Sequence, residues 1–134
     1  MNNIKYSYVQ SRNEDLSVAA AVGDNPTIGQ LQLTINGNNN YKRLVGVMLI
    51  ITDSDGLPYT KAALVSIATT SGVVILSEQP YFCIRPSFNE RPADRIIPVE
   101  NVNGFGHDFR FQVSIENKTD TVQEFTISAV AYFQ

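Results

Sequence analysis

Three residue types that carry much of protein chemistry are scarce or absent in this sequence. Its 134 residues include no tryptophan, one histidine and one cysteine. The single cysteine, Cys83, excludes an intrachain disulfide, and its apolar neighbours predict a small buried side chain rather than a reactive thiol. Cys83 and His107 together cannot supply the three or four ligands of a zinc site. His107 lies beside Asp108, but no serine nucleophile motif accompanies them, so we expect His107 to be structural or exposed to solvent.

Charge is also scarce and is not concentrated anywhere. Charged residues make up 17% of the chain, the formal net charge is -3, and the basic residues are scattered from Lys5 to Lys118. A nucleic-acid-binding surface needs clustered Lys and Arg to displace counterions, so we expect no dedicated nucleic-acid binding. The low charge instead predicts a surface rich in Ser, Thr, Asn and Gln. Such a surface fits a protein partly covered by its neighbours, and it also fits a sugar-facing or extracellular domain.

Long hydrophobic runs are missing as well. The longest run, residues 44–51, is far shorter than the ~20 residues that a transmembrane helix needs, so we expect no membrane insertion. Residues 1–6 lack the charged and apolar segments of a signal peptide. These two observations predict a protein that is made in a cytoplasm and is not inserted into a membrane by its own sequence.

The sequence does contain clear strand patterns. In residues 109–115 every odd residue is large and apolar and every even residue is polar, and residues 125–133 repeat this alternation after a polar turn. Because successive side chains of a strand point to opposite faces, both segments predict strands with one face on a core. Residues 16–22 form an apolar segment that fits either a strand or a short helix. Further strands are predicted at residues 4–8, 31–35, 44–51, 65–70 and 73–76.

Prolines punctuate the part of the chain between residues 80 and 98. Pro80, Pro86, Pro92 and Pro98 flank two short strands, predicted at residues 82–84 and 96–97, which we expect at sheet edges. The total is eight or nine short strands separated by turn signals. This predicts one all-β domain spanning residues 1–134, an antiparallel β-sandwich of the jelly-roll kind with about eight strands, in which residues 1–12 form an extended N-terminal arm.

One loop has the composition of a cation site. The segment Asp53-Ser54-Asp55-Gly56 is similar to the start of an oxygen-rich calcium loop. The twelfth position from Asp53 is Leu64, where such a loop needs a glutamate. A hydrogen-bonded turn is therefore the favoured interpretation of Asp53 and Asp55, and the sequence does not decide whether they bind calcium.

Other motifs in the chain support no chemistry. The triplet at residues 117–119 matches the N-glycosylation pattern, but we interpret it as a polar hairpin turn. The carboxylates Glu78, Asp94, Glu100 and Asp108 occur among turn and edge signals, and no set of residues supports a catalytic mechanism. We therefore expect no enzymatic activity and no cofactor.

As a whole, the chain resembles single jelly-roll viral capsid proteins. The resemblance lies in its length, its eight or so strands, the proline-punctuated connections, the Asn-rich loop at residues 36–40 and a last strand pattern that continues through residues 129–134. The nearest type is the penton, vertex or minor coat protein of an icosahedral bacterial virus. This resemblance implies a structural virion protein, made in the host cytoplasm, that self-assembles as a pentamer or trimer together with other capsid proteins.

Surplus apolar side chains support association independently of that resemblance. Residues 44–51 are apolar on both faces of their strand, and the end of the last strand is apolar on its nominally outer face. Large exposed apolar patches usually mark interfaces, although the N-terminal segment or a loop of the same chain is an equal candidate for the cover. The predicted oligomer interface consists of Leu44, Met48, Ile50, Val130, Tyr132 and Phe133.

An alternative function is a ligand- or carbohydrate-binding β-sandwich module. Its expected contact surface is formed by the loops at residues 36–41, 53–59 and 88–91. The absence of tryptophan and the presence of only six tyrosines count against the aromatic platforms that sugar sites often use. A small β-fold enzyme ranks last among these hypotheses.

Overall fold

The computed structural model describes residues 5–37, 43–57, 59, 63–86, 95–103 and 108–134, without the side chains of residues 100–103. These residues form eight β-strands and one 3-10 helix, named η1. In chain order the elements are β1 (Tyr8–Val18), β2 (Thr27–Asn36), β3 (Arg43–Asp53), β4 (Ala63–Thr69), β5 (Val74–Pro80), η1 (Tyr81–Cys83), β6 (Ile97–Asn103), β7 (Asp108–Asn117) and β8 (Gln123–Phe133).

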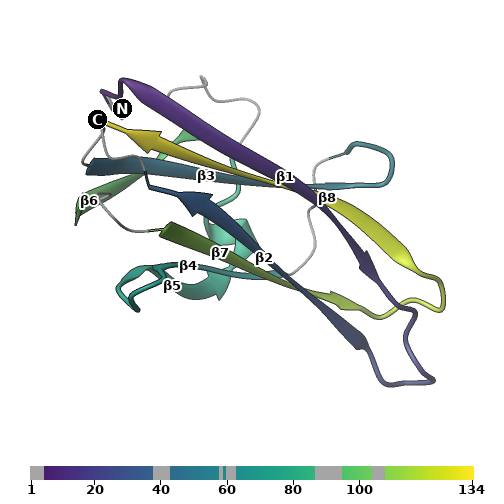
Figure 1. The fold of residues 1–134 in the computed structure, drawn as a ribbon. Coiled ribbons are helices and arrows are strands. Elements are labelled where there is room, and N and C mark those ends of the chain that lie inside the picture. Colours follow the sequence, from purple (N-terminus) through teal and green to yellow (C-terminus); the bar gives the residue numbers. More distant parts are fainter. Residues whose placement is uncertain (1–4, 38–42, 58, 60–62, 87–94, 104–107) are drawn as a thin grey trace.

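The strands form a sandwich of two antiparallel sheets. The strand orders are β1-β8-β3-β6 in the first sheet and β2-β7-β4-β5 in the second, and the two sheets lie face to face (Figure 1). Only β4 and β5 are neighbours both in the chain and in a sheet, so every other connection crosses from one sheet to the other. This is the order of an eight-stranded jelly roll, and it confirms the predicted fold class.

The core lies between the sheets and follows the predicted alternation. In the second sheet, Phe111 of β7 is paired with Leu33 of β2 and Ile67 of β4, and all three side chains are fully buried. In the first sheet, Ile127 of β8 is paired with the equally buried Ile51 of β3. Each such side chain contributes about 1.5–3 kcal/mol by leaving water. The strands predicted at residues 109–115 and 125–133 are confirmed.

A β-bulge explains why residues 44–51 look apolar on both faces. Leu44 is paired with Phe133 and Gly46 with Tyr132, so β3 uses one more residue than β8 at this point. The extra residue shifts the phase of β3 by one position. Leu44 and Val47 consequently both face the core, at 1% and 0% exposure. Part of the apparent surplus of apolar residues is therefore core.

The ends of the chain are paired with each other. Residues 8–12, which were expected within an N-terminal arm, form the first half of β1 and pair with β8. The register places Tyr8 opposite Phe133, and the Ser7 amide donates to the Phe133 carbonyl oxygen at 2.8 Å. The first strand thus begins later than predicted and continues to Val18, so the ambiguous segment from residue 16 onward begins as strand.

The short strand predicted at residues 82–84 is wrong, because residues 81–83 form η1. Pro80 precedes this turn with φ of -60°. Tyr81 is 3% exposed, and its hydroxyl donates to the Leu49 carbonyl oxygen at 3.2 Å and accepts from the Ile51 amide at 3.0 Å. β6 pairs with β3 only as far as Val47. Tyr81 therefore satisfies backbone groups on the part of the β3 edge that β6 does not reach.

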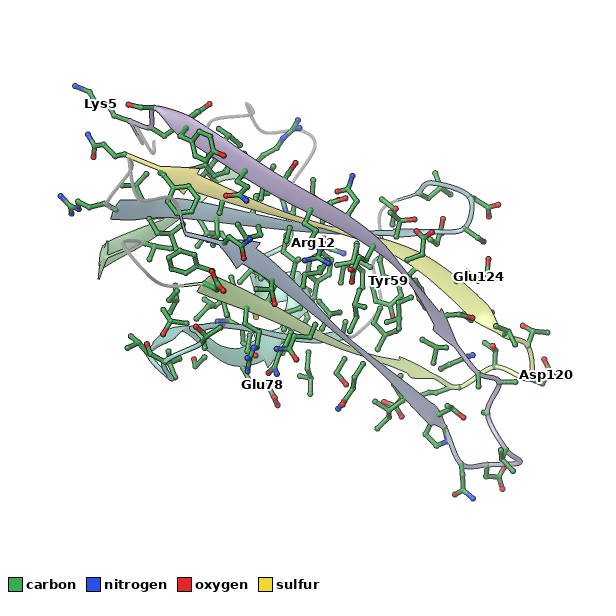
Figure 2. All side chains as sticks on the ribbon, viewed as in Figure 1. Lys5, Arg12, Tyr59, Glu78, Asp120 and Glu124 are labelled. Carbon is green, nitrogen blue, oxygen red and sulfur yellow. The ribbon has the colours of Figure 1, made fainter. Side chains whose placement is uncertain are left out.

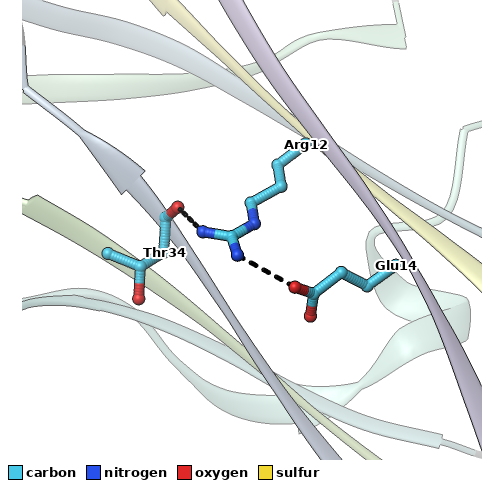
Figure 3. Close-up of polar contacts among 3 residues, drawn as sticks. All are labelled: Arg12, Glu14 and Thr34. Carbon is cyan, nitrogen blue, oxygen red and sulfur yellow. Dashed lines mark hydrogen bonds and ion pairs between the residues drawn. The ribbon is translucent and has the colours of Figure 1, made fainter.

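An arginine bridges the sheets at the side where β1 and β2 are the edge strands (Figure 3). Arg12 Nη1 donates to the Thr34 carbonyl oxygen of β2 at 3.1 Å, and Nη2 donates to Glu14 Oε1 at 3.0 Å. The ion pair is largely exposed, so it adds little stability. An inward-pointing charge on an edge strand also discourages unwanted pairing with other chains.

A glycine lets the two sheets approach each other closely near the end of β1. A Cβ atom built on Gly29 of β2 would lie 2.5 Å from Cγ2 of Val18. Val18 is 1% exposed and cannot move into solvent. Glycine inside a strand often marks such a close approach, and here it is required by a side chain of the opposite sheet.

Candidate functional site

Two of the six predicted interface residues lie in the core. Leu44 and Phe133 face each other across the β3–β8 ladder and are 1% and 0% exposed. The Phe133 ring also contacts Phe109 of the opposite sheet, with centroids 5.8 Å apart. These two side chains therefore offer no surface to a partner in the folded chain.

Three predicted interface residues lie together on the outer face of the first sheet. Met48 of β3 is paired with Val130 of β8, and Ile50 follows Met48 on the same face of β3. All three side chains are partly exposed. Val9 of β1, which is 43% exposed and paired with Tyr132, extends this surface toward the edge of the sheet. We call Val9, Met48, Ile50 and Val130 the apolar outer face.

Tyr132, the sixth predicted interface residue, is covered by the chain itself. Its side chain is 8% exposed, and the Tyr6 ring packs against it edge-on, with centroids 4.9 Å apart. Burial raises the pKa of Tyr132, and the neighbouring Tyr6 adds to the effect. Tyr6 itself remains 46% exposed. At Tyr132, therefore, the apolar surface of the last strand is covered by the N-terminal segment of the same chain and not by a partner.

The other end of this outer face is polar. Ile50 is followed there by Thr52, which pairs with Thr126. The Thr126 hydroxyl donates to Asp15 Oδ1 at 3.0 Å. Figure 2 shows Glu124 toward the end of the sandwich far from Lys5. The first sheet therefore changes from apolar near the paired termini to polar and acidic at its far end.

The outer face of the second sheet carries a groove of about 290 Å³. Two rows of side chains cross three strands there: Gln30, Ser114 and Leu64 form one row, and Gln32, Gln112 and Ser66 form the next. Glu78 of β5 completes the polar lining, and Figure 2 shows it on the outer side of this sheet. We call this feature the glutamine groove.

Most polar side chains of the glutamine groove are not engaged with the rest of the protein. Among the described residues, one hydrogen bond joins two side chains of the groove: Ser66 Oγ donates to Gln112 Oε1 over a long distance of 3.4 Å. Gln30, Gln32 and Gln112 are exposed, and Leu64 is 44% exposed. The groove therefore presents uncommitted donors and acceptors beside one apolar side chain. Sequence reasoning missed it, because the rows join residues 30–32, 64–66, 78 and 112–114.

The Asp53 loop is held by its own hydrogen bonds. Asp53 Oδ1 accepts from the backbone amides of Asp55 and Leu57, both at 3.0 Å, and Gly56 adopts a φ of +77°. These contacts are those of the predicted turn, since Asp caps such turns and glycine tolerates positive φ. Within the described ranges, no three His, Cys, Asp or Glu side chains gather in a way that could hold a metal ion.

Asn117 of the glycosylation-like triplet is the centre of a buried hydrogen-bond network. The residue is 3% exposed, and Nδ2 donates to the carbonyl oxygens of Val18, Ala19 and Thr121 at 2.9–3.2 Å. Its Oδ1 accepts from the amide and the hydroxyl of Thr119. The amide nitrogen that a glycan would occupy is thus enclosed in the folded protein. The interpretation as a hairpin turn is wrong, because β7 and β8 belong to different sheets and the polar connection between them crosses the sandwich. The side chain of Asn117 joins the end of β1 to this connection.

The prediction that Cys83 is buried is wrong. Cys83 is exposed, and its neighbour Phe82 is 60% exposed. The reason lies in η1, which turns Tyr81 inward onto β3 and leaves the next two side chains pointing outward. An alternating strand at this position would have buried one of them.

Several other predicted residues lie outside the part of the chain that the structure describes. These are His107, Asp94, residues 38–41 of the Asn-rich loop and the loop at residues 88–91, together with the side chain of Glu100. Asp108 is partly buried at the start of β7. In the described segments, no helix has the length and apolar character needed to cross a membrane.

Comparisons of the chain with protein-family models, curated proteins and solved structures found no match.

Proposed function

We propose that this chain is a structural virion protein that self-assembles as a capsid building block, in the role of a penton or minor coat protein. The observation that carries the proposal is the strand order, β1-β8-β3-β6 against β2-β7-β4-β5. Eight-stranded jelly rolls with two Greek keys are a common architecture of viral capsid domains. This support is an analogy of fold, so the function itself must reside in a surface of the domain.

The apolar outer face is the surface that we assign to self-assembly. Three strands of this sheet have 11 residues and β6 has 7. At about 4.8 Å between strands and about 3.3 Å per residue, the whole outer face of the sheet covers at most about 14 by 36 Å, or about 500 Å², and the apolar outer face is only a part of it. A stable interface needs about 800 Å² from each partner. We therefore expect the contact to extend from Met48 and Val130 onto flanking residues such as Tyr6. The copies form a pentamer or trimer, and other capsid proteins complete a shell made in the host cytoplasm.

The native mass of the purified chain tests this proposal. We expect multi-angle light scattering across a concentration series to give a discrete pentamer or trimer. A monomer at every concentration would refute self-assembly through this face.

A pair of variants assigns the contact to one sheet. Val130→Lys introduces a charge at the centre of the apolar outer face and should yield a monomer with an unchanged far-UV circular dichroism spectrum. Gln112→Lys introduces the same charge on the central strand of the opposite sheet and should assemble like the parent protein. If Val130→Lys assembles normally, the contact is elsewhere.

A further inference from the structure

The glutamine groove is a built surface that the proposed assembly does not use. It lies on the outer face of the second sheet, whereas the apolar outer face belongs to the first. Antiparallel pairing fixes its two rows, because Gln30 and Leu64 both face Ser114, and Gln32 and Ser66 both face Gln112. The rows lie two residues apart along each strand, about 7 Å. The groove is therefore positioned by the sheet itself and not by loops.

The side chains of the groove favour a neutral ligand rich in hydroxyl groups. A glutamine amide offers two donors and an acceptor without charge, and a serine hydroxyl offers both functions. Among the described residues, the lining contains Glu78 as its one carboxylate and no Lys, Arg or His. The nearest cation on this face is Arg110, which lies one row beyond Gln112 and outside the lining. A phosphate or another anion would therefore meet no cation within the lining and would be repelled by Glu78. A wholly apolar ligand would find only the half-exposed Leu64 and would leave the amides without partners.

A sugar ring combines the two properties that this lining matches. Its hydroxyl groups can both donate to and accept from Gln32 and Gln112, and a carboxylate such as Glu78 accepts from hydroxyl groups. Its C–H face can lie on the Leu64 side chain. Recognition here would depend on hydrogen bonds and on Leu64 rather than on aromatic stacking, because no aromatic side chain is among the described residues of the lining.

We propose that the glutamine groove binds a neutral saccharide. A volume of about 290 Å³ lies at the small end of ligand sites, so the occupant is one or two sugar residues, or the end of a longer glycan. This inference does not depend on self-assembly, and its test does not involve the native mass.

Titration followed by nuclear magnetic resonance tests the inference directly, because the groove contains its own reporters. Lactose, maltose, cellobiose and N,N'-diacetylchitobiose are added separately to ¹⁵N-labelled protein, each to about 20 mM, which would nearly saturate a site with a Kd of about 1 mM. We expect at least one of them to shift the side-chain amide resonances of Gln30, Gln32 and Gln112 saturably. Inorganic phosphate at the same concentration should leave these resonances unchanged.

Two variants and one matched control assign the shifts to the groove. Gln32→Ala and Gln112→Ala should each weaken the binding at least tenfold. Asn36→Ala removes an exposed amide from the same strand as Gln32 but outside the groove, and it should bind like the parent protein. The inference is overturned if none of the four sugars shifts the glutamine resonances, if both glutamine variants bind normally, or if phosphate produces the same shifts.

Discussion

The hydroxyl group of Tyr81 gives the sharpest test of how this fold is held together. It is a single oxygen that accepts from the Ile51 amide at 3.0 Å and donates to the Leu49 carbonyl oxygen at 3.2 Å, on a side chain that is 3% exposed. Tyr81→Phe would keep the ring in the core but leave two backbone groups of β3 without these partners. Each unsatisfied buried group costs about 1–3 kcal/mol, so the loss of two partners should lower the free energy of unfolding by about 2–6 kcal/mol.

That loss is a large share of the total stability of a domain, which is typically about 5–15 kcal/mol. It is measured by urea denaturation followed by far-UV circular dichroism, since the chain has no tryptophan to report by fluorescence. Parent and variant must be compared at one protein concentration, because assembly would shift the apparent stability. Native-state hydrogen exchange adds a local readout, in which the Ile51 amide should lose more protection than its neighbours in β3.

Tyr132→Phe is the matched control. Tyr132 is also nearly buried, at 8% exposure, but the structure shows no hydrogen bond from its hydroxyl within the described residues. Its removal should change the free energy of unfolding by less than about 0.5 kcal/mol, as is usual for substitutions that break no specific contact. If Tyr81→Phe is no more destabilising than Tyr132→Phe, then Tyr81 does not complete the edge of β3 and the reasoning fails.

Three further predictions concern packing, the polar network and pH. Gly29→Ala should lower the free energy of unfolding, measured by urea denaturation, by about 1–3 kcal/mol, because the added methyl group overpacks the core against Val18. In a protein that also carries Val18→Ala, part of this loss should disappear. If the effects of the two substitutions simply add, the two side chains do not clash. Asn117→Ala should lower the free energy of unfolding by about 3–5 kcal/mol in the same assay, whereas Asn13→Ala, at an exposed position, should leave it almost unchanged. Equal effects of the two substitutions would show that the hydrogen bonds of Asn117 do not stabilise the fold. Burial raises the pKa of Tyr81, despite the Ile51 amide and Arg85, which lower it. The unfolded chain therefore loses this proton first, so the contribution of Tyr81 to the free energy of unfolding should be complete below about pH 10 and should be lost as pH rises above it. Tyr81→Phe should show a shallower fall of stability above about pH 10.

Alternation made the strands of the core predictable from sequence. Residues 109–115 and 125–133 have period-2 patterns, and their inward side chains, such as Phe111 and Ile127, are fully buried. The number of strands and the jelly-roll class followed from the turn signals between such segments. Where the period was broken, prediction failed: the bulge in β3 moved Leu44 inward, and the side-chain bonds of Tyr81 turned a predicted strand into η1.

The candidate surfaces were predictable only in part. Met48, Ile50 and Val130 lie on an outer face, since each is one position out of phase with a core residue, and their role in an interface stays a prediction. Cover of the last strand by the N-terminal segment was one of two equal alternatives, and the sequence did not decide between them, since the contact between Tyr6 and Tyr132 joins residues 126 positions apart in the chain. The glutamine groove gave no signal in the sequence, because glutamine and serine on the outer side of a strand are ordinary solvent-facing residues.

The sequence by itself determined which residues face inward along most strands, because a strand alternates its side chains without regard to its neighbours. It also determined that the chain carries little charge and few reactive groups. The tertiary structure alone decided which strands lie side by side, since six of the seven connections cross between the sheets. That order brings Gln32 beside Gln112, Arg12 to the backbone of Thr34 and Asn117 to the end of β1. These surfaces and hydrogen bonds depend on pairing between segments that are distant in the chain, and no local sequence pattern predicts that pairing.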